Sequence, residues 1–454
     1  MSTFSGINQA SRALTAAQRA MEVTGQNIAN ANTPGYSRQR VDQVSSVVAD
    51  TGQWARQNVP GDGVQITGIS RVADALAAAT ARQDSATAAE QKTTAGVWTG
   101  IEGALGDTGG TGLSKDLADL SAAWNDLANA QGSQAADAAK ALVLSRSQTV
   151  ASTLNSMDSQ LSAQFDGLVG QGQAVVDQAN EAARRVADLN AVILRASSSG
   201  SIPNELLDQR DGYVNQLADL TGARVVQREH GVVDVYVGNG AIVSRDSVEP
   251  LRLDAPGGFS LEGAKNGQRM TFTIAGTVVE PPAGQLKATL DGVNKTLREQ
   301  SDRLDQLAGD IVAAGNRGQN PAPLEVKPGA TTAAGVRVVP AYDFRALVAS
   351  DSGSVNGAVA AQVQKDLAAV TGTWRVFAND IASSTQSADN RATLAQQVSL
   401  KSSAAREAVS GVSIDEEMTN LVSYQHAYSA AARVLTAIDE ALDRLINRTG
   451  VVGR

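Results

Sequence analysis

The sequence predicts a mainly α-helical protein with a small inserted β domain, and three patterns support this fold class. Nine of the 11 prolines lie between Pro203 and Pro340. The long stretches on either side can therefore form helices, whose interiors a proline would destabilise by about 3 kcal/mol. Apolar residues near both ends of the chain repeat every seven residues. The region after residue 222 is instead rich in valine and alternates as strands do.

The first proline-free stretch has the pattern of amphipathic helices. Large apolar residues follow one another at steps of three and four, which places them on one helical face. They are Leu117, Leu120, Trp124 and Leu127, and farther on Val176, Ala179, Ala183, Val186 and Ile193, with a gap near Asn190. Runs of glycine and serine at 106–112 and 197–201 predict loops between these helices.

Another helix is predicted over residues 203–222. Asn204 is placed to cap its first turn, and Gly222 is placed to end it. Segments 224–237 and 241–253 then read as strands of a hairpin whose turn is 238–240. Because 269–274 alternates as well, we predict an outer β domain over residues 223–282.

Helical spacing resumes from Leu286 to Ile311. Residues 319–350 are expected to be irregular, with short strands at 324–327 and 335–339. From Ser354 onward the pattern is helical again, with a break near Ser410 and Gly411.

The C-terminal segment carries the clearest heptad pattern, which we call the C-terminal seam. Its steps alternate between three and four from Leu421 onward, as in a coiled coil. The seam consists of Ile414, Leu421, Tyr424, Tyr428, Leu435, Ile438, Leu442 and Leu445, with Ala431 between them. Ser413 is a candidate cap, and the adjacent Glu416 and Glu417 suit the positive end of the helix dipole.

The N-terminal segment has a matching pattern. Bulky residues recur every seven positions at Ile7, Leu14, Met21 and Ile28, with Ala10, Ala17, Thr24 and Ala31 between them. Residues 1–45 hold four arginines against two acids, a balance of +2, whereas residues 413–454 hold four against six, a balance of −2. Opposite charge favours contact between the two ends, although each surface pair contributes little.

The C-terminal seam needs a partner, because leaving its large side chains in water would forfeit on the order of 10 kcal/mol. Periodicity alone supports a partner within the chain and a partner in a neighbouring copy equally well.

Helical segments flank the β domain on both sides, which predicts a nested arrangement. In it, the first helical segment of the chain pairs with the last, and the second pairs with the second-to-last. We predict a terminal coiled-coil assembly domain (1–45 with 411–454) and a helical bundle (46–222 with 283–410) beside the β domain.

Composition excludes several classes of function. The net charge of −9 gives no overall electrostatic basis for binding nucleic acid. No cysteine and only two histidines are present, so we expect no thiol chemistry, cofactor or metal site. No apolar run is long enough to insert in a membrane, and no cleavable signal peptide is recognisable.

An enzyme is not expected. Glu416 and Glu417 are adjacent, so in a helix they point about 100° apart and cannot flank one substrate. We interpret them as charges of the first helical turn, and His426 as a packed or surface residue. No phosphate-binding loop or nucleophile motif occurs. A binding module or adhesin centred on the β domain remains an alternative, although 223–282 shows neither a basic patch nor an aromatic platform.

A polar turn follows the N-terminal helix. Pro34 disfavours helix at Thr33, and Pro34-Gly35 suits the centre of a type II turn. The side chains of Asn27, Asn30 and Asn32 are able to bond the backbone at the helix end.

This turn resembles the N-terminal motif of the bacterial flagellar axial proteins, which comprise the rod, hook and hook-associated proteins. The matching residues are Asn27-Ile28-Ala29-Asn30 and Thr33-Pro34-Gly35-Tyr36. Within that family the chain is most similar to the hook-associated proteins of the hook–filament junction, through 112–130, through NELLDQRD at 204–211 and through 412–435. NELLDQRD argues against the alternatives of a hook or distal rod subunit. The resemblance is weak over the β domain and 319–350.

The resemblance implies a structural subunit rather than an enzyme. It implies an inner tube of terminal helices, surrounding bundles and outward β domains, with export through the flagellar type III apparatus to the extracellular flagellum. The implied partners are copies of the chain in a ring, the hook protein, a second junction protein (hook-associated protein 3) and a cytoplasmic chaperone on the C-terminal helix. The assembly residues would be the C-terminal seam and, at the N-terminus, Ile7, Leu14, Met21, Asn27, Ile28, Asn30, Thr33, Pro34, Gly35 and Tyr36.

Overall fold

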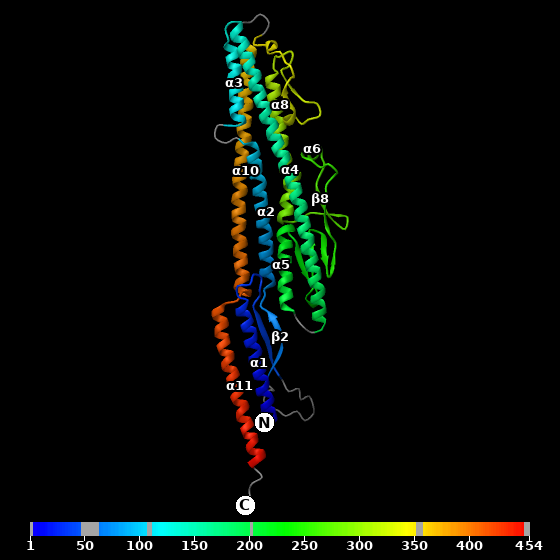
Figure 1. Ribbon diagram of the computed structural model, residues 1–454, viewed down its shortest axis with the longest axis vertical. Helices are drawn as coiled ribbons and strands as arrows, with labels where there is room; N and C mark the ends of the chain where they lie inside the picture. Colours follow the sequence, from blue (N-terminus) through cyan, green and yellow to red (C-terminus); the bar gives the residue numbers. More distant parts are fainter. Residues whose placement is uncertain (1–2, 47–62, 107–110, 200–202, 351–356, 449–454) are drawn as a thin grey trace, which may run out of the picture.

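The protein is elongated, with a pair of terminal helices at one end and a long helical bundle at the other (Figure 1). The computed structural model describes residues 3–46, 63–106, 111–199, 203–350 and 357–448, and side chains from residue 6 to 444 within these ranges. Helix α1 (Thr3–Ala29) packs against α11 (Ile414–Arg448), and α2 (Ala75–Leu105) packs against α10 (Ala358–Ser410). This confirms the predicted mainly helical fold with nested pairing.

The bundle is organised by α4 (Ser133–Ser198), which at 66 residues is about 100 Å long. The predicted apolar face of α3 (Leu113–Asn129) is fully buried against α4 and α10. The other helices of the bundle are α5 (Asn204–Thr221), α7 (Gly284–Asp291), the π-helical turn η2 (Gly292–Thr296) and α8 (Leu297–Gly315). Helix α10 ends at Ser410, at the break that the sequence predicted.

The β domain lies along α4 and consists of two small antiparallel sheets. One has the order β3 (Arg224–Gln227), β4 (Val233–Val237), β5 (Gly240–Ser244), β6 (Ser247–Val248). The other has the order β7 (Leu251–Asp254), β8 (Thr271–Ile274), β9 (Thr277–Val279). Short helical turns accompany them at η1 (Glu229–Gly231) and α6 (Leu261–Lys265).

Two asparagines of α4 attach this domain to the bundle. Asn180 exchanges two hydrogen bonds with the backbone of Leu251, each of 2.8 Å. Buried Asn190 donates to Val233 O at 2.8 Å and to Arg245 O at 2.6 Å. The gap in periodicity near Asn190 is therefore not a helix break, since α4 continues through it with its polar side chain bound to strands.

Short strands form in the irregular region as predicted. Strand β10 (Leu324–Val326) pairs with β11 (Val336–Val338), and the turns α9 (Thr332–Gly335) and η3 (Phe344–Ala346) flank the pair.

One strand pair was not predicted. Strand β1 (Gln39–Ser45) pairs antiparallel with β2 (Val64–Arg71) beside α1. We expected only helices between residue 61 and the β domain, and this was wrong for β2. Its residues Val64, Ile66 and Ile69 lie in a short, partly buried strand. The pair also spans residue 45, where we placed a domain boundary.

Candidate functional site

The terminal helix pair meets the bundle at a polar connection that we call the joint. It contains the turn at 30–38, the start of α2, the first turns of α5 and the α10–α11 break at 411–413. Figure 1 shows α1, α11, β2 and the lower ends of α2 and α10 converging there. The joint therefore fixes how the terminal pair is held relative to the bundle.

Asn27 lies at the centre of the joint and is 1% exposed. Its Nδ2 donates to Gln39 O at 2.9 Å and to Glu417 Oε2 at 3.0 Å. Its Oδ1 accepts from Gln39 N and from Tyr36 Oη, both at 2.9 Å. One amide group thus connects α1, the turn, β1 and α11, which explains the value of asparagine at this position of the N-terminal motif.

The turn after α1 has the predicted form. Tyr36 N donates to Thr33 O at 3.2 Å, and Gly35 has a φ of 82°, which suits glycine at the third position of a type II turn. Asn30 Nδ2 donates to Gln26 O at 3.0 Å and so satisfies a carbonyl in the last turn of α1. Thr33, Pro34 and Gly35 themselves are exposed at the mouth of the joint.

Arg38 binds both glutamates of the first turn of α11. Its Nη2 lies 2.8 Å from Glu416 Oε1, and its Nε lies 2.7 Å from Glu417 Oε1. The Arg38 amide also donates to Ser410 O at 2.8 Å. Glu417 is 2% exposed whereas Glu416 is 57% exposed. Our interpretation of both glutamates as helix-dipole charges was incomplete, because Glu417 is a buried ion-pair partner.

The start of α5 supplies the bundle side of the joint. Asp208 accepts from Ser37 N at 3.1 Å, from Ser37 Oγ at 2.8 Å and from Arg71 Nη1 at 2.6 Å. Gln39 Nε2 donates to Glu205 at 3.1 Å. The NELLDQRD motif and the N-terminal turn, far apart in the sequence, are thus binding partners. Sequence reasoning missed this, because nothing in either motif indicates the other.

Asn204 differs from its predicted role as a helix cap. It is the first residue of α5, and Pro203 stands at the cap position without a capping side chain. Asn204 Nδ2 instead donates to Gln39 Oε1 at 3.1 Å and to Ile69 O at 3.0 Å. The side chain attaches β1 and β2 to the bundle, which is a tertiary role that local sequence does not show.

The carboxylates around Tyr36 change its acidity. Burial raises the pKa of the Tyr36 phenol to about 12, and the negative charges of Glu205, Asp208 and Glu417 add to the effect. The phenol therefore remains a neutral donor to Asn27 throughout the physiological range.

The middle and later part of the C-terminal seam packs against α1 of the same chain. Leu421, Tyr424, Leu435, Ile438 and Leu442 are half-buried, and Ala431 is buried. Ile414 and Tyr428 are exposed, and Leu445 lies outside the residues whose side chains are described. On α1 the small positions make the buried face: Ala10, Ala17, Ala20, Val23 and Thr24. Ile7, Leu14, Met21 and Ile28 are half-buried, and their role in assembly stays a prediction.

Two apolar stripes remain uncovered next to the joint. On α11, Ile414, Met418 and Val422 repeat every four residues and are each about half exposed. On the lower half of α10, Leu394 is 61% exposed, and Val398 and Val409 lie on the same helical flank. Exposed apolar stripes at helical spacing are typical of surfaces that pack against another protein.

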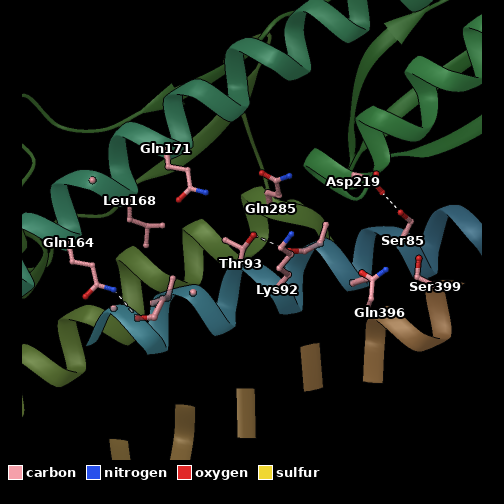
Figure 2. A pocket seen from close by; sticks show the side chains of 16 residues that line it. Ser85, Lys92, Thr93, Gln164, Leu168, Gln171, Asp219, Gln285, Gln396 and Ser399 are labelled. Carbon is pink, nitrogen blue, oxygen red and sulfur yellow. Dashed lines mark hydrogen bonds between the residues drawn. The ribbon is translucent and has the colours of Figure 1, made fainter. Parts of the chain in front are cut away.

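A separate cavity of about 810 Å³ lies between α2 and α4 (Figure 2). Small and amide side chains dominate its lining, together with Lys92 and Asp219. Burial raises the pKa of Asp219, whose carboxylate accepts a hydrogen bond from Ser85 at 2.5 Å. Within the described ranges, no three His, Asp or Glu side chains are grouped to hold a metal ion, and no helix has the length and apolarity to cross a membrane.

Known proteins match this chain in three segments. The family model described as the flagellar hook-associated protein FlgK helical domain matches residues 98–325. The model of flagella basal body rod proteins matches 7–36, and that of the flagellar basal body rod FlgEFG protein C-terminal region matches 407–448.

Individual relatives agree with these matches. Flagellar hook-associated protein 1 of Bacillus subtilis is 28% identical over an alignment of 524 positions, which covers 100% of both chains. Its Escherichia coli namesake is 28% identical over 66% of this chain, which spans only 54% of that relative. A solved structure of the flagellar hook junction protein FlgK from Burkholderia pseudomallei aligns with a TM-score of 0.45 and 23% identity, over 56% of this chain and 46% of the other.

Proposed function

This chain belongs to the FlgK family of flagellar hook-associated proteins and is a structural subunit of the bacterial flagellum, and we propose that it forms the junction between hook and filament. In this proposal the terminal helices are the assembly elements, and the bundle and β domain lie outside them. The observation that carries the proposal is the joint, in which the N-terminal axial motif is bound by NELLDQRD and by the first turn of α11.

Neighbouring copies are the first proposed partners. The apolar stripes on α10 and α11 lack any covering element in the described part of the chain, which supports contacts between copies in a ring. The residues of both terminal segments named above are the proposed interface. The side chains of the C-terminal seam are mostly half-buried against α1. A neighbouring copy would therefore cover only the part of this surface that α1 leaves exposed.

Other partners follow from the family. We propose contacts with the hook protein on one side and with hook-associated protein 3 on the other, in the extracellular flagellum. Before type III export, a cytoplasmic chaperone would cover the apolar seam of α11. Catalysis is not part of the proposed function. The proposed division into a terminal domain, a bundle and an outer β domain follows the prediction, except that the whole β1–β2 pair is assigned to the terminal domain.

A hook or distal rod subunit is the main alternative, because the models that match both ends describe rod proteins. The hook-associated helical domain, which matches 98–325, favours the junction instead. A surface adhesin has no supporting observation in the β domain.

Deletion of the gene tests the proposal. We expect cells with complete hooks, no filaments and flagellin released into the medium, and we expect antibody against this protein to label only the hook–filament boundary of wild-type flagella. Loss of the hook itself, or labelling along the whole hook, would instead support the rod or hook alternative.

A further inference from the structure

Helix α1 carries a row of large apolar residues that α11 covers only in part. Ile7, Leu14 and Met21 recur every seven residues and are each half-buried, and we call them the bulky flank. Leu14 lies five residues after Gln9, which packs against Gly63 directly before β2, so the two positions are about 140° apart around α1. The open side of the bulky flank therefore faces away from the β1–β2 pair.

Helix α11 carries an exposed row of uncharged residues, most of them alanine, which we call the small row. Each member precedes a residue of the C-terminal seam by one position. The members are Ser423, Ala427, Ala430, Val434, Ala437 and Ala441. The solvent-facing side of a helix normally carries polar side chains, so about 27 Å of exposed helix without a charge or an amide is suited to contact with protein.

The small row opens on the other side of the terminal pair. Ser423, Ala430 and Ala437 follow Glu416 at steps of seven, which keeps them on the same side of α11 as Glu416. Arg38, the residue directly before β1, binds Glu416 from that side. The small row thus lies on the side that holds the β1–β2 pair, and the bulky flank opens on the opposite side.

Two contacts fix which residues of α1 and α11 lie at the same height. Asn27 donates to Glu417 at the joint, and near the other end a Cβ at Gly6 would come within 3.1 Å of Ile438 Cδ1. The two contacts are 21 residues apart on both helices, so the antiparallel pair keeps one register. Each member of the bulky flank is therefore level with a member of the small row: Ile7 with Ala437, Leu14 with Ala430, and Met21 with Ser423.

The two rows are complementary in size at equal height. Each large side chain of one row has an alanine or serine at its level in the other, and Val434 is level with the gap between Ile7 and Leu14. Large residues that insert between smaller ones are the packing pattern of coiled coils. Neither row contains a charge, so a contact between them buries no ion.

The rows of one chain cannot meet each other, because they lie on opposite sides of the terminal pair. The terminal pair extends beyond the bundle (Figure 1), so a second copy at the same height presents its own terminal helices there. Every copy carries both rows, and contacts between unlike faces of identical copies repeat and can close into a ring.

We propose that the bulky flank of α1 docks on the small row of α11 in the next copy, at the same height along the long axis. The proposal rests on the self-assembly proposed above. It adds the two faces, the direction and the register through which neighbouring copies meet.

Disulfide trapping tests this contact, because the chain contains no cysteine. A chain with Leu14→Cys and Ala430→Cys carries one thiol on each face. We expect oxidised flagella from such cells to contain a ladder of disulfide-linked dimers, trimers and larger oligomers. The matched control combines Thr15→Cys, on the exposed polar side of α1, with Ala430→Cys and should give about tenfold less linked protein.

A third pair of cysteines measures the register. Leu14→Cys and Ala437→Cys would meet only if neighbouring copies were shifted by seven residues, which is about 10 Å along the helix. We expect this pair to give about tenfold less linked protein than the pair at 14 and 430. Stronger trapping at 437 would overturn the level register.

An exchange of side-chain size gives an independent readout. Ala430 is exposed in the single chain, so Ala430→Leu should leave the melting temperature unchanged while the number of filaments per cell falls about tenfold or more. Ala430→Ser keeps the position small and should leave filaments normal. Adding Leu14→Ala to Ala430→Leu moves the large side chain to the opposite face and should restore most filaments.

Normal filaments with Ala430→Leu, or trapping no stronger for 14 with 430 than for 15 with 430, would overturn the docking proposal while leaving the junction function intact. Absence of the wild-type protein from the hook–filament boundary would instead contradict the junction function itself.

Discussion

The side chain of Asn27 donates a hydrogen bond of 3.0 Å to the carboxylate of Glu417, although 390 residues separate the two in the chain. The contact joins the last turn of α1 to the first turn of α11 inside a buried network. The N-terminal axial motif therefore does more than stop a helix, since its asparagine organises the joint.

Asn27→Ala should destabilise the terminal pair by about 1–3 kcal/mol, because it leaves buried groups of Gln39 without partners. Native-state hydrogen exchange of the α1 amides measures this free energy of opening. Asn30→Ala is the matched control, since Asn30 bonds only its own helix end and residue 33, and should cost less than about 0.5 kcal/mol. Equal effects of the two changes would contradict the central role of Asn27.

Glu417→Gln should cost more than Glu416→Gln. The first weakens a nearly buried ion pair with Arg38, for which we expect about 1–3 kcal/mol. The second weakens an exposed pair, for which we expect less than about 1 kcal/mol. Both changes preserve side-chain shape, so thermal unfolding of the two variants compares burial directly. A larger loss with Glu416→Gln would overturn this ranking.

The Tyr36 phenol should lose its proton at a higher pH than an ordinary tyrosine. Its folded-state pKa of about 12 exceeds the reference value of 10.0, so the protein favours the neutral phenol. The resulting stability is fully present below pH 10 and is lost as pH rises from 10 through 12. The tyrosinate absorbance of wild type minus that of Tyr36→Phe should show one transition near pH 12. A transition near pH 10 would show that the phenol is not held among the carboxylates.

Substitutions on the two faces of α11 should have different effects. Val422→Asp is on the exposed stripe, so the monomer should lose less than about 0.5 kcal/mol of unfolding free energy while filament formation fails. Leu435→Asp and Ile438→Asp face α1, so they should open the terminal pair at a cost of about 1–3 kcal/mol, block assembly and leave the bundle folded. Circular dichroism measures the stability of each variant, and filament counts measure its assembly, so the two together separate these outcomes. Normal filaments with Val422→Asp would remove the exposed stripe from the interface.

The sequence predicted the elements whose cause is local or periodic. The α3 face, the C-terminal seam, the Pro34-Gly35 turn and the break at Ser410 all follow from spacing or from backbone restrictions of single residues. The role of the C-terminal seam in assembly stays a prediction, because packing on α1 does not exclude contact with a neighbour.

The joint could not be predicted in the same way. Glu417 reads locally as a favourable charge at a helix start, and Asn204 reads as a cap. Only the tertiary arrangement gives Glu417 the partner Arg38 and gives Asn204 the partner Gln39. Strand β2 escaped notice for a related reason, since its short alternation is interrupted at Gly68 and its partner precedes it by some twenty residues.

The nested topology has a consequence for the order of folding. The pairing of α1 with α11 closes a loop of nearly the whole chain, so α1 can contact β1 and β2 early but meets its partner helix only when the last helix has been synthesised. Contacts of such long sequence separation form slowly, whereas α3 and α4 are neighbours in sequence and meet early. We therefore expect a refolding chain to acquire its bundle first and its terminal pair last, and pulsed hydrogen exchange would record that sequence of events.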